Sequence, residues 1–116
     1  MILHFCPRSE WTAAVERGEY RHESLDHEGF VHCSDPGTVH LPATALFAGR
    51  TDLVLLVIDP AVLDLPVRWE AGEPAHPSGV WFPHVYGPIP VDAVVAVVDF
   101  PPSPDGGFVL PPALAG

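Results

Sequence analysis

The chain has 116 residues, of which 47% are hydrophobic and 17% charged, as expected for one globular domain. Its 15 acidic residues outnumber 5 basic residues, all arginines, and the net charge of -10 makes nucleic acid and anionic membranes poor partners. The longest apolar run, Leu53–Ile58, is too short to cross a bilayer, and no basic, apolar leader is recognisable. We therefore expect a cytoplasmic monomer or homodimer whose partner is a small molecule.

The beginning of the chain predicts a strand followed by a helix. Residues 2–6 are mostly apolar, and Pro7 ends the strand. Ser9 is a suitable N-cap for a helix that Gly18 stops. Spacing predicts that the buried side of this helix is formed by Trp11, Ala14 and Val15.

A polar loop, a second strand and a second helix are predicted next. Residues 19–29 are polar and irregular, and we expect them to form a loop over the functional site. Residues 30–34 form the predicted strand. Asp35 and Pro36 then resemble an N-cap and a first helical position, for a helix that reaches Phe47. Pro42 is expected to kink it or interrupt it.

The rest of the chain predicts further strands. Residues 53–58 are apolar throughout and indicate a central strand covered on both faces, and residues 60–64 suggest one helical turn. A short strand is expected at 67–70, with Val67 and Trp69 inward. Residues 71–79 are rich in turn formers, and 94–100 should close the sheet as a buried strand. The fold class is α/β (α+β), a strand-rich single domain over 1–100 with a split mixed sheet, two early helices and a loose proline-rich tail at 101–116.

Polar side chains in the first two strands point to a functional cleft. Alternation puts Ile2, His4 and Cys6 on one face of the first strand, and Phe30, His32 and Ser34 on one face of the second. We expect His4 and His32 to share one cleft, where imidazoles bind ligand or move protons. The alternative for His4 is a satisfied structural histidine. The alternative for Ser34 is a helix cap. If both histidines line one site, the two cysteines lie on opposite faces and form no disulfide.

Further candidate residues lie in the second half of the chain. Glu70 ends a strand and is a candidate general base or hydroxyl acceptor, although many such glutamates are only solvated. His84 and Tyr86 are two residues apart within "FPHVYGP", so an extended chain points them the same way. The alternative is a structural corner. The histidines and Cys33 lack the spacing of a zinc site, and we expect no metal.

Four segments carry a resemblance to a known family: "ILHFCPRSEWTAAVERGEY", "SLDHEGFVHCSD", "DLVLLVIDPAVLDLPVRWE" and "FPHVYGPIPVDAVVAVVDF". They resemble the bacterial domain of unknown function 952 family over about residues 1 to 100. That family is grouped with ADP-ribosyltransferase-like folds, which bind NAD in a cleft between two sheet halves. The resemblance implies that His4, His32 with Ser34, and Glu70 correspond to the three signature positions of those transferases, although histidine at the second position departs from their usual tyrosine.

Three functions follow as expectations. The first is an NAD-linked transferase or hydrolase with His4, His32 and Glu70 as catalytic residues, and with Ser34, His84, Tyr86 and Arg21 as ligand-binding residues. The second is a cofactor-free acid–base catalyst, such as an isomerase or cyclase of a biosynthetic pathway, using the same cleft. The third is a non-catalytic ligand-binding or interaction module on an enzyme scaffold.

Overall fold

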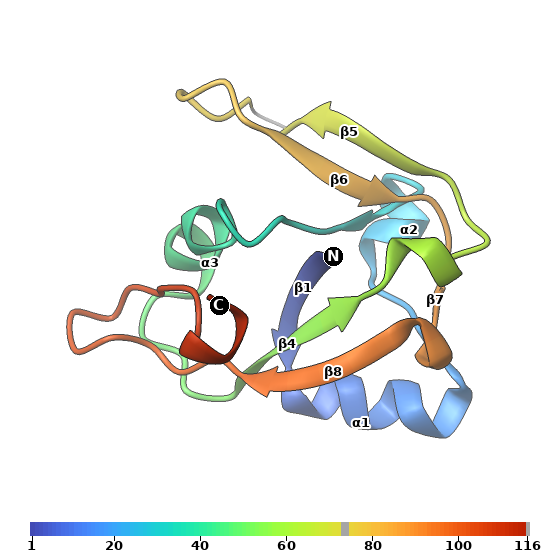
Figure 1. Ribbon diagram of the computed structural model, residues 1–116, viewed down its shortest axis with the longest axis horizontal. Coiled ribbons are helices and arrows are strands. Elements are labelled where there is room, and N and C mark those ends of the chain that lie inside the picture. The colour runs from blue at the N-terminus through green and yellow to red at the C-terminus, as the bar shows by residue number, and fades with distance from the viewer. Residues whose placement is uncertain (73–74, 116) are drawn as a thin grey trace.

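The computed structural model describes residues 1–72 and 75–115 as a strand-rich α+β domain (Figure 1). The strands are β1 (Ile2–Pro7), β2 (Glu19–Tyr20), β3 (Val31–His32), β4 (Leu53–Ile58), β5 (Val67–Ala71), β6 (Trp81–Val85), β7 (Ile89–Pro90) and β8 (Val94–Asp99). The helices are α1 (Arg8–Arg17), α2 (Ser24–His27) and α3 (His40–Phe47), with 3-10 turns at Pro60–Val62, Val91–Ala93 and Pro112–Leu114.

The strands form three small sheets, with the orders β1-β4-β8, β2-β7 and β3-β6-β5. The prediction of a mixed sheet is wrong for the described residues, whose strand pairs are all antiparallel. Parallel neighbours need a crossover packed over their own sheet, and here the early helices instead connect strands of different sheets. In Figure 1 the β5–β6 hairpin runs along the top, and the β1-β4-β8 sheet lies below it.

Strand β4 is the centre of the molecule, as predicted from its apolar run. All six of its residues are buried between β1 and β8. Its alternate side chains enter two hydrophobic clusters, one on each face of the sheet: Val54 and Leu56 belong to one, Leu55 and Val57 to the other. Full burial of each such side chain contributes about 1.5–3 kcal/mol, so this strand is a major source of stability.

Strand β8 forms where the sequence predicts it, but the prediction that it is buried is wrong. Within the described part of the chain it pairs only with β4 and so forms an edge of its sheet. Val95 is 61% exposed and Val97 37% exposed. Valine favours strands whether or not both faces are covered, which is why composition alone overstated the burial.

The proline-rich tail is packed, where the sequence predicts a loose or surface-draped segment. Phe108 is buried and lies against Phe100, with ring centroids 4.8 Å apart. The Phe108 amide also donates to the Thr44 hydroxyl at 3.0 Å. Leu110 and Leu114 pack on the same cluster. The tail therefore completes the second core as far as Leu114, and residue 116 lies outside the described residues.

Helix α1 begins and ends close to the predicted positions. Helix α1 starts at Arg8, with Pro7 rather than Ser9 at its N-cap, and ends at Gly18, whose φ of 86° suits glycine. Of its predicted buried stripe Ala14 is buried, whereas Val15 is 52% exposed. No helix in residues 1–72 and 75–115 is long and apolar enough to cross a bilayer.

Helix α3 begins later than predicted because residues 35–39 form a turn closed by Val39 N–H donating to Asp35 O at 3.0 Å. Pro42 therefore falls in the first turn, where a missing N–H loses no intrahelical hydrogen bond. In the β5–β6 hairpin Trp69, predicted inward, is 46% exposed. Residues 73 and 74 of the turn-rich segment predicted at 71–79 lie outside the described residues.

Candidate functional site

The structure does not bring the His4 and His32 imidazoles into one cleft. An antiparallel bridge pairs Leu3 with Ser34, and directly paired residues share a face of the sheet. His4 is therefore on the face of Cys33 and Val31, one residue out of step with His32. His4 is only 6% exposed, whereas 44% of the His32 side chain is accessible. The prediction of a shared cleft is wrong, because it requires the segment after β3 to pair with β1 shifted by one residue.

Both ring nitrogens of His4 have partners. Nδ1 donates to the backbone carbonyl of His32 at 2.6 Å, and Nε2 lies 2.8 Å from the Tyr20 hydroxyl. That hydroxyl is also 2.9 Å from the Glu10 carboxylate, so its single proton is shared between two acceptors. Burial lowers the pKa of His4 to about 4, against the weaker opposing effect of the bond to His32. His4 thus behaves as the satisfied structural histidine that the sequence left open.

The two cysteines also lie on this inner face. Cys6 and Cys33 are both buried, free and part of the first hydrophobic cluster. The expectation that they point to opposite faces is wrong, because the Leu3–Ser34 bridge puts Cys33 on the face of His4 and Cys6. Burial raises the pKa of Cys6 to about 12 and raises that of Cys33 further. Neither thiol is poised as a nucleophile, because the thiolate is the reactive form.

A second group of polar side chains forms on the β3-β6-β5 sheet. His84 of β6 is paired with His32 of β3 and with Arg68 of β5. Glu70 is paired with Phe82, two residues before His84 and therefore on the same face. The β5–β6 hairpin and the distant strand β3 thus present their polar side chains together.

Glu70 joins His84 and Tyr86 through one carboxylate oxygen. Oε1 accepts from the Tyr86 hydroxyl at 2.6 Å and from His84 Nδ1 at 2.9 Å. The bond from Tyr86, then that from His84, lowers the pKa of Glu70, and the same contact raises the pKa of Tyr86. The guanidinium of Arg68 lies over the Tyr86 ring, 4.8 Å from its centroid. Glu70 is consequently held as an anion, and Tyr86 as a neutral donor.

His84 is left with one unsatisfied nitrogen. Its residue is 4% exposed, and its Nε2 is buried with no hydrogen-bond partner. The ring stacks on Phe30 with centroids 4.0 Å apart and planes 11° from parallel. Because an ionised carboxylate accepts from Nδ1, we assign a proton to that nitrogen, and in the neutral ring Nε2 then carries the lone pair.

A cavity of about 320 Å³ lies beside this group, lined by Glu28, Phe30, Glu70, Ala71 and His84. Its volume is at the lower end of the ~300–1,000 Å³ usual for small-molecule sites. At its rim His32 Nε2 is 3.1 Å from each oxygen of Glu28. Of the predicted site residues, the structure therefore places Glu70 and His84 in the cavity, with His32 and Tyr86 directly behind or beside them.

Ser34 and Arg21 do not line this cavity. Ser34 is buried where its backbone bridges to Leu3, at 2.7 Å in both directions. It does not cap α3, whose N-cap is Val39. Arg21 is exposed and pairs with Glu19 at 3.4 Å. The segment expected as a loop is partly ordered: Tyr20 of β2 is fully buried and α2 follows it.

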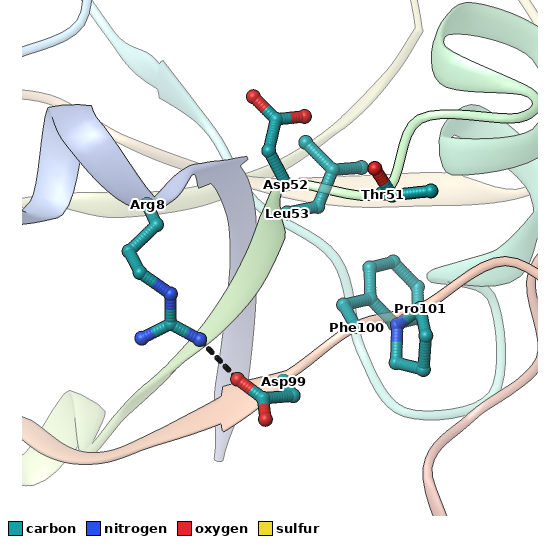
Figure 2. A pocket seen from close by; sticks show the side chains of 7 residues that line it. All are labelled: Arg8, Thr51, Asp52, Leu53, Asp99, Phe100 and Pro101. Carbon is teal, nitrogen blue, oxygen red and sulfur yellow. Dashed lines mark hydrogen bonds and ion pairs between the residues drawn. The ribbon is translucent and has the colours of Figure 1, made fainter.

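A second hollow of about 300 Å³ lies at the edge of the β1-β4-β8 sheet where β1 and β8 end and β4 begins (Figure 2). Figure 2 shows Arg8 reaching across it to Asp99, with Phe100 and Pro101 beside them. Asp52, on its wall, is held by Arg50 through bonds of 2.9 and 2.6 Å. The hollow's charged groups are already paired and largely exposed, which makes it the weaker candidate.

Sequence reasoning missed Tyr20, Glu10 and Glu28 as partners of the histidines. Tyr20 is the one aromatic residue of a polar segment, and that contrast is a usable signal of burial. Glu28 precedes His32 by four residues, but its contact arises from a turn and not from a helix. Within the described residues no group of three or more metal-binding side chains is suitably placed to hold an ion.

The comparisons with known proteins identify the family but no activity. The crystal structure of protein CC0527 from Caulobacter crescentus is 31% identical and superposes with a TM-score of 0.81, covering 94% of this chain and 93% of that one. The solution NMR structure of CC0527 is 32% identical, with a TM-score of 0.77 and coverages of 98% and 96%. No curated protein matches. The profile of the protein family of unknown function DUF952 matches residues 5–97, so the chain belongs to the DUF952 family.

Proposed function

We propose that this protein is a small-molecule enzyme in which His84 transfers a proton and Glu70 stabilises positive charge. The observation that carries the proposal is the buried, unpartnered Nε2 of an imidazole whose other nitrogen is held by a carboxylate. An unsatisfied buried polar atom costs about 1–3 kcal/mol. A group retained at that cost, beside a cavity, is well suited to a ligand contact.

The arrangement supports general base catalysis. Glu70 fixes the His84 ring and its tautomer, so that the lone pair on Nε2 is available to accept a proton from a bound molecule. The imidazolium formed is stabilised by the Glu70 anion 2.9 Å away. Tyr86 keeps Glu70 ionised and prevents it from competing as the base. Phe30, stacked on the ring, and the burial of Nε2 limit the access of water to this nitrogen.

The proposal redistributes the predicted catalytic roles. Glu70 keeps its role as a charged catalytic residue. His84, predicted as a ligand-binding residue, becomes the general base, and His32 becomes a rim residue that holds Glu28. His4 is assigned a structural role, because both of its nitrogens are already bonded.

The NAD-linked reaction and the ADP-ribosyltransferase-like fold, both implied by the family resemblance, are the second candidate. One observation favours them: an ionised Glu70 beside the Phe30 ring suits a positively charged ring or oxocarbenium-like centre. A whole NAD does not fit the residues present, since the two ionisable side chains other than His84 that line the cavity are carboxylates and would repel its pyrophosphate. We therefore derive no step through NAD.

Proton transfer is tested by deuterium exchange. A panel of small carbonyl compounds, each with an α C–H and half of them bearing an amine, is incubated with the protein in D₂O and followed by proton NMR. We expect His84→Gln to slow the exchange by roughly 100-fold. His40→Gln, at an exposed position of α3, is the matched control and keeps wild-type rates.

Equal exchange by wild type and His84→Gln, or no exchange of any compound, would overturn the catalytic proposal. Addition of NAD to the same samples tests the second candidate, which predicts release of nicotinamide. Binding of panel compounds without exchange would favour the non-catalytic ligand-binding module instead.

A further inference from the structure

We propose that the ligand of this cavity is a compact organic cation, specifically a primary ammonium on an apolar carbon skeleton. This inference rests on the proposed function of the His84 cavity, which we define by its lining residues Glu28, Phe30, Glu70, Ala71 and His84. It concerns the chemical class of the ligand, which neither the family nor the similar structures assign.

Apart from His84 Nδ1, which already donates to Glu70, the polar side-chain atoms of the lining residues are hydrogen-bond acceptors when His84 is neutral. Glu28 and Glu70 contribute carboxylates, and a neutral His84 contributes the lone pair of Nε2. Phe30 and Ala71 have no polar side-chain atom. A ligand that satisfies three acceptors must itself bring N–H or O–H donors, and a primary ammonium has three.

The charges point in the same direction. Glu70 is held ionised by Tyr86 and His84, and both of these contacts use Oε1, which leaves Oε2 for a ligand. Glu28 receives one shared contact, from His32. The nearby Arg68 is placed over the Tyr86 ring and is not a lining residue. The cavity thus holds two negative charges that its own residues only partly offset.

The rest of the molecule reinforces this preference. The net charge of -10 raises the local concentration of cations and lowers that of anions. Phe30 and Ala71 supply apolar wall, so a carbon skeleton attached to the ammonium gains contact area. A bare metal ion would use the carboxylates but not this wall.

An ammonium ligand also gives the proton transfer a definite form. His84 Nε2 accepts one proton from R–NH₃⁺, which yields R–NH₂ and an imidazolium beside Glu70. The total charge and the number of protons are unchanged, and the nitrogen lone pair becomes free to react. The half-buried Phe30, stacked on His84, must shift for the ligand to reach Nε2.

The test uses three ligands with the same ring: benzylammonium, benzyl alcohol and benzoate. Each is titrated into the full-length protein, and the amide shifts of Phe30 and Ala71 are followed by ¹⁵N NMR. We expect benzylammonium to bind at least about tenfold more tightly than benzyl alcohol, since charge-assisted hydrogen bonds are about twice as strong as neutral ones. Benzoate should not bind.

Variants separate the cavity from the acidic surface. Glu28→Gln should weaken the binding of benzylammonium at least about fivefold. Glu16→Gln, at an exposed position of α1, removes the same charge elsewhere and should leave this affinity unchanged. Equal losses in the two variants would mean that the cation only gathers in the general negative field, and would overturn the inference.

Equal affinity for benzyl alcohol and benzylammonium would also overturn the ligand class while leaving the proton-transfer proposal intact. That proposal fails independently, through unchanged deuterium exchange in His84→Gln.

Discussion

Two histidines of this protein are equally buried and have opposite surroundings. His4 is 6% exposed and His84 is 4% exposed. Around His4 a carbonyl and a hydroxyl occupy both ring nitrogens, whereas around His84 one nitrogen is bonded to Glu70 and the other has no partner. Burial of an imidazole is therefore no guide to its role. The number of partners left open distinguishes the structural histidine from the candidate catalyst.

The largest expected effect comes from replacing each of the two histidines by phenylalanine. His4→Phe leaves the His32 carbonyl without a partner, removes one of the two contacts of the Tyr20 hydroxyl and forces a larger ring into a packed interior. It should lower the free energy of unfolding by roughly 4 kcal/mol. His84→Phe removes the unsatisfied nitrogen and keeps an aromatic ring against Phe30, so its stability should stay within about 1 kcal/mol of wild type. Urea unfolding measures both, and equal losses would abolish the distinction.

A pH titration of stability should report on His4. Its pKa is about 4 in the folded protein and 6.5 as its ordinary value, so the unfolded chain binds more protons between these pH values. The stabilisation is complete above pH ~6.5 and decreases by about 3 kcal/mol as the pH falls to ~4. The slope should disappear in His4→Gln, so that the difference in stability between wild type and the variant isolates the contribution of His4. An unchanged slope in His4→Gln would show that another group causes it.

Removal of the Tyr20 hydroxyl and removal of the Tyr86 hydroxyl should lower the free energy of unfolding by unequal amounts. Tyr20→Phe deprives His4 Nε2 of its buried partner and should cost about 2 kcal/mol. Tyr86→Phe removes one bond to Glu70, whose side chain is 40% exposed and can bind water instead, so it should cost less than about 1 kcal/mol. Thermal or urea denaturation compares them, and the reverse order would contradict the comparison.

The smallest effect tests the register that separates the histidines. Cys33 lies in the core on the face of His4, and Cys33→Ala should cost about 1 kcal/mol through lost packing. His32→Ala, at a side chain that is 44% accessible, should change stability by less than about 0.5 kcal/mol. Should His32 be the more costly of the two in urea unfolding, the inner and outer faces of β3 have been exchanged.

Much of the fold could be predicted because it depends on local pattern. The six apolar residues of β4 and the Gly18 stop of α1 are signals contained in a few neighbouring residues. The burial of Phe108 and the exposure of Val95 could not be predicted, since they depend on which distant segment covers which face. The local pattern of residues predicts a strand, but the segments that pack against it determine whether its side chains are buried.

The candidate site was predictable in its residue types but not in its grouping. Glu70, His84 and Tyr86 stood out individually as polar residues beside apolar strands. Their convergence depends on the pairing of β5 with β6, and that register is set by long-range contacts. The error over His4 and His32 was likewise one of register: a shift of one residue between β1 and the segment after β3 reverses the face.

The open edge of β8 has a consequence for handling the protein. Val95 and Val97 lie on a strand whose outer backbone groups have no partner strand among the described residues, which is the arrangement that another chain can extend. At neutral pH the charge of -10 keeps molecules apart. Near the isoelectric point of about 4.8 that repulsion vanishes. Colloidal stability should accordingly be lowest around pH 5. Aggregates formed there should grow by pairing of β8 edges from different molecules, and they should redissolve slowly.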